Sequence, residues 1–196
     1  MTWNDIAKMF GRWLREFAAE PKVDGPSGSL SVDIAATGYS VSEDEAEKRG
    51  LIVNWFVFQE GDKYAWGGKI PASVENPDEG DCSGYTQRAY VEANMDLCHG
   101  AAYQFEQCLP VREPLPGDLG FLWSTGRKCI GHVMMYTDGG MVTHSVGGRG
   151  VVVDSESEWT DNPRWRGWRR HPDFARSLAD RPASGPEAPG WLKDAL

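Results

Sequence analysis

The stretch "EGDCSGYTQRAY", Glu79 to Tyr90, places one cysteine where a helical pattern begins. Asp81 is a residue type that caps helix N-termini, and Tyr85 and Ala89 follow at helical spacing, so we expect a helix whose first turn contains Cys82. Unpaired backbone N–H groups and the positive end of the helix dipole would then face its sulfur. The sequence therefore predicts a Cys82 thiol with a lowered pKa, which is the property of a nucleophilic cysteine.

Cys82 also needs a base, and the four histidines differ in their predicted surroundings. His171 precedes a proline in a charged segment and His99 lies in a loop, so we expect both to be solvated. His132 begins the strand-like run "HVMMY", and His144 lies in the next run, "MVTHSV", across the turn "TDGG". On one face of this hairpin, His132 can take the thiol proton while His144 holds the imidazole in its working orientation.

The length of the hairpin loop decides whether the two histidines meet. A three-residue loop over 137–139 would pair His132 with His144 and place both side chains on one face. A two-residue loop over 138–139 would pair His132 with Ser145 and turn His144 to the opposite face. We predict the three-residue loop, and with it a Cys-His-His triad.

A metal site is the alternative use of the remaining cysteines. Cys98, His99, Cys108 and Cys129 are ligand types for zinc, but they lack the close cysteine pairs of structural zinc sites. Four cysteines are also too few for a disulfide scaffold in a chain of this length, so their default state is reduced. We therefore expect no metal and interpret Cys98, Cys108 and Cys129 as small buried thiols.

The elements around the cysteine predict an α+β fold. The motif "SEDE" is a capping box in which the Glu45 carboxylate returns to the backbone of Ser42. It begins a helix with Leu51, Trp55 and Phe58 on one face, although the run "LIVNWFVF" leaves a buried strand as the alternative. After a short helical piece, "AAYQFEQ", the runs "GDLGFLW", "HVMMY", "MVTHSV" and "VVVD" are typical of strands. We expect N-terminal helices packed on an antiparallel β-sheet.

Composition divides the chain into one domain with two extensions. Residues 1–19 carry large apolar side chains on one helical stripe, so we expect an amphipathic helix that packs on the main domain or docks a partner protein. Residues 20–41 contain prolines and glycines and are interpreted as a linker. The domain is predicted over residues 42–174, and the proline-rich residues 175–196 form a C-terminal arm.

Charge and hydropathy exclude several classes of function. The chain has 196 residues, 40% of them hydrophobic, and a net charge of −9, which disfavours nucleic acid and anionic membrane surfaces as partners. Its longest apolar run is far shorter than the roughly 20 residues that a bilayer span requires. The N-terminus lacks the pattern of a Sec signal peptide. The arginines and tryptophans of residues 164–170 are interpreted as an edge strand with a solvated face rather than a nucleic-acid patch.

Four motifs in order, "YAWGG", "DCSGY", "PGDLGF" and "GHVMMY" with "MVTHS", resemble the NlpC-type cell-wall cysteine peptidases over roughly residues 43–170. The resemblance implies a papain-like α+β hydrolase in which Cys82 is the nucleophile, His132 the general base and His144 the orienting residue. It also implies that the backbone N–H of Cys82 helps to hold the oxyanion, and that no metal or organic cofactor takes part.

The same resemblance implies what the substrate is and where it lies. Tyr64, Trp66, Asp81 and Ser83 are the expected substrate-binding residues. The expected substrate is the stem peptide of peptidoglycan, cut after D-glutamate through an acyl-enzyme. The alternatives are an amidase, a deamidase or an acyl transferase on another substrate, and a non-enzymatic structural component of a phage tail that retains the fold.

An enzyme of this kind has to reach the cell wall. Because no Sec signal is recognised, one hypothesis is a virion-associated protein, delivered in an assembly such as a phage tail tip and docked there through residues 1–19. The alternative is a phage lysis enzyme that stays in the cytoplasm until its release.

Overall fold

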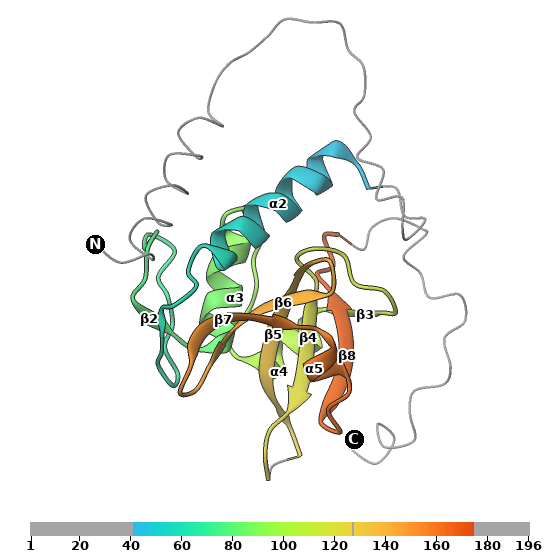
Figure 1. Cartoon of the computed structure of the whole chain (residues 1–196). Coiled ribbons are helices and arrows are strands. Elements are labelled where there is room, and N and C mark those ends of the chain that lie inside the picture. The colour runs from blue at the N-terminus through green and yellow to red at the C-terminus, as the bar shows by residue number, and fades with distance from the viewer. Residues whose placement is uncertain (1–40, 127, 175–196) are drawn as a thin grey trace, which may run out of the picture.

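The computed structural model describes residues 41–126 and 128–174, in which helices and a β-sheet form separate layers (Figure 1). The helices are α2 (Glu43–Val57), α3 (Cys82–Val91), α4 (Ala101–Gln107) and α5 (Ser157–Thr160). The strands are β1 (Lys63–Tyr64), β2 (Glu79–Gly80), β3 (Leu109–Val111), β4 (Leu119–Trp123), β5 (Ile130–Asp138), β6 (Met141–Val146), β7 (Gly150–Ser155) and β8 (Trp165–Arg170). The predicted α+β class, with helices packed on an antiparallel sheet, is confirmed.

The main sheet has the strand order β3-β8-β4-β5-β6-β7, and each neighbouring pair is antiparallel. β1 and β2 form a separate parallel pair immediately before α3. The arginine-rich and tryptophan-rich strand β8 lies between β3 and β4, so its prediction as an edge strand is wrong. β3 pairs with residues 168–170, a long-range contact that the sequence pattern around β3 does not predict.

The start of α2 follows the predicted capping motif in part. Ser42 is the N-cap, and its hydroxyl accepts a hydrogen bond from the backbone N–H of Glu45 at 3.2 Å. The Glu45 carboxylate does not return to Ser42 as predicted. It accepts instead from Nε of Arg49 at 2.8 Å, and the same guanidinium binds the buried Asp118 at 3.0 Å. The carboxylate therefore holds a buried arginine rather than closing the capping box.

The face that α2 buries also differs from the prediction. Ile52, Trp55 and Phe56 are buried, whereas Leu51 is 44% exposed and Phe58 is only half-buried. The inward stripe begins one turn earlier with an arginine, so a periodicity counted on apolar residues alone assigns the wrong face. The alternative of a buried strand over this run is excluded, because the run is helical through Val57.

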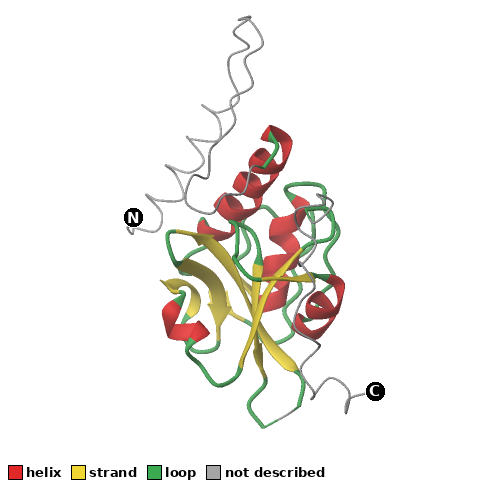
Figure 2. Cartoon of the chain, turned by 90° about the vertical axis from the view of Figure 1, so that its right-hand side faces the viewer, coloured by secondary structure: helices red, strands yellow, loops and turns green. Residues whose placement is uncertain are grey.

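Two apolar clusters occupy the two faces of the sheet. Val133 and Met135 of β5 belong to the cluster beneath α2 and α3. Met134 belongs to the opposite cluster with Trp168 and contacts from Trp159 of α5, the short helix on the other side of the sheet (Figure 2). Alternation along β5 therefore decides which side chains face the helices and which face α5.

The turn between β5 and β6 is shorter than predicted. It consists of the two glycines at 139–140, both with positive φ (58° and 74°), so the three-residue loop over 137–139 is wrong. Consecutive glycines supply the left-handed conformations that a type I′ hairpin turn needs. An irregularity at Thr137 then shifts the register, so that Tyr136 pairs with Val142.

The predicted helix at 1–19 and the predicted arm at 175–196 lie outside the described residues, as does all of the predicted linker 20–41 except its last residue, and these three regions stay predictions. Within the described ranges, no helix combines the length and the apolar character that a membrane crossing requires.

Candidate active site

Cys82 lies where the sequence predicts it, at the first residue of α3. Asp81 is the N-cap, and its Oδ1 accepts from the backbone N–H of Gly84 at 2.6 Å and from the Ser83 hydroxyl at 2.8 Å. Gly84 is required because the helix starts against the preceding loop: a Cβ there would lie 2.2 Å from the carbonyl oxygen of Gly68. These contacts fix the start of the helix and therefore the backbone of Cys82.

The predicted low pKa of the cysteine is wrong. Burial, together with the nearby Asp81 carboxylate, raises the pKa of the Cys82 thiol to about 12. Backbone N–H groups, that of Val133 among them, act in the opposite direction without cancelling the effect of burial. The helix start is present as predicted, but removal of the sulfur from water outweighs it, since only 6% of Cys82 is exposed. The resting thiol is therefore protonated.

The sulfur sits where strands β5 and β6 part. Their pairing begins at Met135, and the stretch of β5 before it, which pairs with β4 on its other side, turns the backbone N–H of Val133 toward the thiol. On the β6 side, the Ser145 hydroxyl donates to the carbonyl oxygen of Gly80, two residues before the cysteine. Within the described residues, the thiol makes no hydrogen bond to the His132 ring; its contact on β5 is with the backbone of the next residue.

His132 and His144 are in contact, although not through the predicted register. Their rings are hydrogen-bonded, with Nε2 of His132 and Nδ1 of His144 at 2.8 Å. Continuing the observed register places Met134 opposite His144, which makes His132 its diagonal neighbour on the same face. The loop is one residue shorter than predicted, and the bulge at Thr137 adds one residue to β5. The two rings therefore still meet on one face, as diagonal rather than directly opposite neighbours.

Both imidazoles are held in the neutral form. Burial, together with the electrostatic effects of His144 and Arg164, lowers the pKa of His132 to about 3. Burial also lowers the pKa of His144, against the raising effect of its contact with Asp154. A neutral imidazole has a free ring nitrogen that can accept a proton, so His132 is chemically competent as a base.

Asp154 is the residue of this cluster that the sequence interpretation missed. Its Oδ2 lies 3.0 Å from Nε2 of His144, on the side of the ring away from His132. A signal was present in "VVVD": β7 pairs with β6, Val152 lies opposite His144, and Asp154 follows two residues later on the same face. This signal could be interpreted only with the register of β6 and β7, which the sequence alone does not give.

A groove with a volume of about 280 Å³ opens at Cys82. It is lined by Tyr64, Trp66, Gly67, Asp81, Cys82, Ser83, His99, Gly100, Ala101, Ala102, Tyr103, Ile130 and Gly131. The structure thus brings all four predicted substrate-binding residues, Tyr64, Trp66, Asp81 and Ser83, to one cavity with the cysteine. The histidine at 132 follows directly after the β5 residues of this wall.

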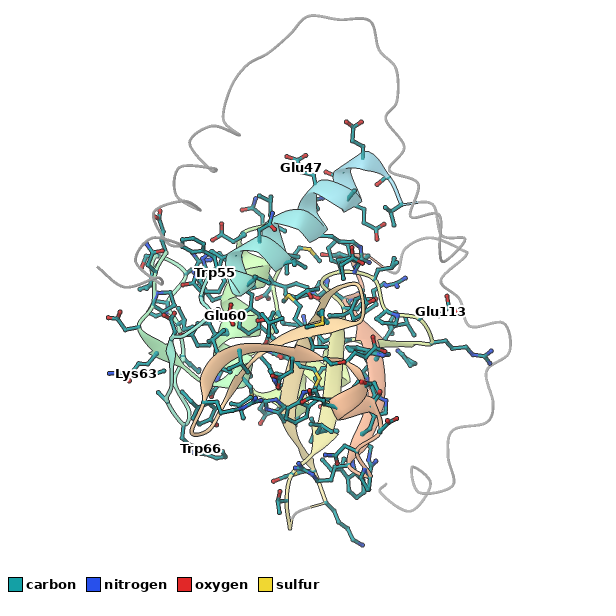
Figure 3. All side chains as sticks on the ribbon, in the orientation of Figure 1. Glu47, Trp55, Glu60, Lys63, Trp66 and Glu113 are labelled. Atoms are coloured by element: carbon teal, nitrogen blue, oxygen red, sulfur yellow. The ribbon has the colours of Figure 1, made fainter. Side chains whose placement is uncertain are left out.

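Side chains of different character border the groove. Trp66 is 87% exposed and projects away from the ribbon (Figure 3), and Tyr103, which also lines the groove, is 65% exposed. Burial, together with the nearby Cys82 and Asp81, raises the pKa of Tyr64 to about 12, so its hydroxyl stays protonated. The groove therefore presents exposed aromatic side chains together with the protonated hydroxyl of Tyr64.

The prediction of two solvated histidines is wrong. His99 lies in the groove with Nε2 at 3.2 Å from Oδ2 of Asp81, and 17% of its side chain is exposed. His171 is buried, with Nε2 at 3.0 Å from the Asp96 carbonyl oxygen and its ring 5.4 Å from that of Tyr90. Both contacts join segments that are distant in the sequence or in separate elements, so neighbouring residues gave no indication of them.

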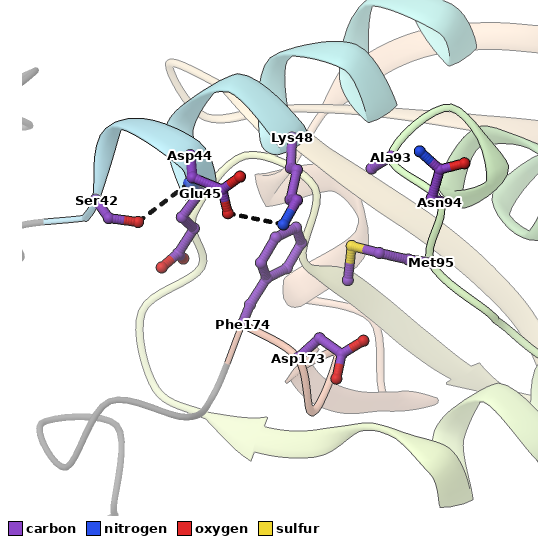
Figure 4. A pocket seen from close by; sticks show the side chains of 9 residues that line it. All are labelled: Ser42, Asp44, Glu45, Lys48, Ala93, Asn94, Met95, Asp173 and Phe174. Atoms are coloured by element: carbon purple, nitrogen blue, oxygen red, sulfur yellow. Dashed lines mark hydrogen bonds and ion pairs between the residues drawn. The ribbon is translucent and has the colours of Figure 1, made fainter.

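A larger cavity, of about 570 Å³, lies at the start of α2 and shares no residue with the groove (Figure 4). Phe174 and Met95 form its apolar side, and an ion pair between Lys48 and Asp44 at 2.7 Å crosses its rim. It contains no cysteine or histidine, so we do not assign the chemistry to it.

The remaining cysteines are not all buried as predicted. Cys108 is buried, with a pKa raised to about 12 by burial and the nearby Asp118, whereas Cys98 and Cys129 are exposed. In the part of the chain that the structure describes, no group of three or more His, Cys, Asp and Glu side chains is arranged to hold a metal ion.

Comparison with known proteins agrees with this geometry. The family model for the NlpC/P60 family matches residues 61–170, more than half of the chain. The peptidoglycan DL-endopeptidase CwlO of Bacillus licheniformis is 33% identical over 108 residues, which cover 53% of this chain and 22% of that protein. The chain therefore matches only about a fifth of the length of this curated relative.

Solved structures show the same fold. An NLP/P60 family protein of Staphylococcus aureus, similar to lipoprotein, is 24% identical with a TM-score of 0.53, and the match covers 86% of this chain and 61% of that one. The peptidoglycan hydrolase RipB of Mycobacterium tuberculosis is 19% identical with a TM-score of 0.53, covering 86% of this chain and 81% of that one. These likenesses confirm the papain-like α+β fold. With the extent of the family match, they establish that this chain belongs to the NlpC/P60 family of cell-wall peptidases.

Proposed function

We propose that this chain is a cysteine peptidase that hydrolyses an amide bond in the stem peptide of peptidoglycan. The observation that carries the proposal is the arrangement of Cys82 at a helix start, on a groove, beside the strand whose His132 binds His144. The family membership and the name of the relative CwlO, a peptidoglycan DL-endopeptidase, support the substrate class. The bond after D-glutamate is the proposed point of cleavage.

Cys82 is the proposed nucleophile and His132 the proposed base. His132 takes the thiol proton as sulfur forms a bond to the scissile carbonyl carbon, and the backbone N–H of Cys82 supports the developing oxyanion. Collapse of this intermediate breaks the C–N bond, and the proton passes from His132 to the departing amine. Water, activated by the same imidazole, then cleaves the thioester and regenerates the thiol. His144 keeps the His132 ring oriented throughout.

Tyr64, Trp66, Asp81 and Ser83 are the proposed substrate-binding residues, since they line the groove around Cys82. Asp81 and Ser83 are already engaged with the helix start, which makes them fixed polar points along the peptide. Trp66 offers an exposed apolar surface at the mouth.

Release of new amino groups from purified peptidoglycan sacculi tests the proposal. Cys82→Ala and His132→Ala are expected to abolish release, whereas Cys98→Ala, which removes an exposed thiol outside the groove, is expected to retain it. His144→Ala is expected to be milder because it removes orientation rather than the base. Full activity of Cys82→Ala would refute the proposal, and product masses would distinguish an amidase or an acyl transferase.

Delivery in a virion or release as a lysis enzyme is the proposed route to the cell wall, and docking in a virion depends on residues 1–19, which lie outside the described residues. Comparing the full chain with one that lacks residues 1–41 tests it. Equal cleavage of isolated stem peptides, with loss of association with phage tail components in the shortened chain, is the expected result. Equal association of both chains would refute the docking role.

A further inference from the structure

We propose that Asp154 is a positioning residue that fixes the proton positions on both histidine rings and leaves Nδ1 of His132 as the nitrogen that receives the thiol proton. This inference rests on the proposed function, and it deepens that function by naming a fourth member of the site. Asp154 would act through His144 rather than on the substrate, since it is absent from the lining of the groove.

The hydrogen-bond chain permits one arrangement of protons when the carboxyl group is ionised. An ionised carboxylate only accepts hydrogen bonds, so Nε2 of His144, 3.0 Å from Asp154 Oδ2, must carry the proton. The ring is neutral, so its Nδ1 then has a free lone pair. That nitrogen can only accept at the 2.8 Å contact, which requires Nε2 of His132 to donate. Neutral His132 is left with its lone pair on Nδ1.

The surroundings of Asp154 keep the carboxyl group ionised. Burial alone would raise its pKa, but hydrogen bonds from Arg149 and His144 lower the pKa overall. Nη1 of Arg149 donates to Oδ1 at 3.1 Å, and its Nη2 donates to Oδ2. The indole N–H of Trp159 also donates to Oδ2, at 3.3 Å. Arg149 and Trp159 can only donate at these contacts, so both oxygens accept hydrogen bonds, and this favours the ionised carboxylate.

Packing holds the His144 ring in the orientation that its hydrogen bonds to Asp154 and His132 require. The indole of Trp159 makes an edge-to-face contact with His144, with ring centroids 4.6 Å apart, and lies 5.9 Å from the His132 ring. His144 itself has no exposed surface. A ring confined in this way cannot turn to exchange its two nitrogens, so the hydrogen-bond pattern is imposed by the fold rather than selected by the substrate.

The proton positions are directly measurable in the full chain by long-range ¹H–¹⁵N correlation of ¹⁵N-labelled histidine, which distinguishes Nδ1–H from Nε2–H rings. The wild-type protein at pH 7 is expected to show Nε2–H for both His132 and His144. An Nδ1–H form of His144 in the wild-type chain would overturn the proposal without any variant. This measurement needs no peptidoglycan, so it decides the proposal even if the wild-type chain releases no amines from sacculi and the proposed function fails.

Variants separate positioning from a purely structural role. Asp154→Ala is expected to mix the two proton forms on both rings and to lower kcat at least about tenfold with little change in KM, since the carboxylate does not touch the substrate. Asp154→Asn keeps an acceptor oxygen toward His144, so it is expected to retain the proton positions and to lose less kcat. Asp161→Asn, at the exposed end of α5, is the matched control and is expected to behave as wild type.

Two results would overturn the role of Asp154. One is an Asp154→Ala chain that keeps both Nε2–H rings and its kcat. The other is an Asp154→Asn chain that keeps both rings yet loses as much kcat as Asp154→Ala, because the acceptor would then not be the feature that matters. If Asp154→Ala does not fold, the wild-type spectrum and the isosteric Asn variant still give a decision.

Discussion

Lowering the pH from 7.5 to 5 is expected to reduce the free energy of unfolding by about 2 kcal/mol through His132 alone. The pKa of this imidazole is lowered to about 3 by burial and by the charges of His144 and Arg164, whereas an unfolded chain has a histidine pKa of about 6.5. Between these values the unfolded state binds a proton that the folded state does not. Stability is therefore highest above the unfolded pKa and is lost as the pH falls toward the folded pKa.

Urea unfolding of the wild-type chain and of His132→Gln, followed by tryptophan fluorescence at both pH values, measures this contribution. Glutamine does not titrate, and its amide can still donate to His144. His144 also has a lowered pKa and would destabilise both proteins at low pH, so the difference between the two proteins isolates His132. The wild-type chain should lose about 2 kcal/mol more than the variant on acidification.

Equal losses in the two proteins would refute the reasoning. Such a result would mean that His132 already binds a proton in the folded state near neutral pH, and that burial does not keep its ring neutral. The account of a resting site with neutral groups would then have to be abandoned.

Three further outcomes follow from the packing. Iodoacetamide near neutral pH is expected to alkylate exposed Cys98 before Cys82, whose thiol has a pKa raised to about 12, and peptide mass spectrometry would contradict this if Cys82 reacted first. Gly84→Ala is expected to destabilise the chain by about 2 kcal/mol or more in thermal unfolding, because its Cβ would lie 2.2 Å from the Gly68 carbonyl oxygen. Asp118→Ala is expected to cost about 3–5 kcal/mol in urea unfolding, because it removes the buried carboxylate that two buried guanidinium groups share, and a loss below about 1 kcal/mol would contradict this.

Features set by a few neighbouring residues were predictable from the sequence. The cap at Asp81 and the helix beginning at Cys82 depend on side chains within one turn, and both are observed. The strand-like runs that carry His132 and His144 are also observed, since strand-prone residues bounded by glycine-rich turns indicate a strand locally. The class of fold follows from the order of such elements.

Features set by distant segments were not predictable in the same way. The burial of His171 depends on its contacts with Tyr90 and Asp96, both more than seventy residues earlier. Asp154 reaches His144 only because β7 pairs with β6 in one register. The hairpin loop was misjudged by one residue, and only the compensating bulge kept the two rings on one face. Contacts of this kind can be predicted only when the order and register of the strands are known.

The pKa of the thiol shows most clearly why local reasoning failed at the site. A helix start is worth about 0.3–1 kcal/mol to a negative charge at the surface, which is less than one pKa unit. Burial raises the pKa of Cys82 from an ordinary value near 9.0 to about 12, an effect of about 4 kcal/mol. The larger effect decides the resting state, so neither the thiol nor the His132 ring is charged on its own. Transfer of the proton from sulfur to imidazole creates both charges together with no net charge, and their attraction offsets part of the burial that each would meet alone. Reactivity in this site therefore has to come from the pairing of Cys82 with His132, and the dipole of α3 assists that step without being sufficient for it.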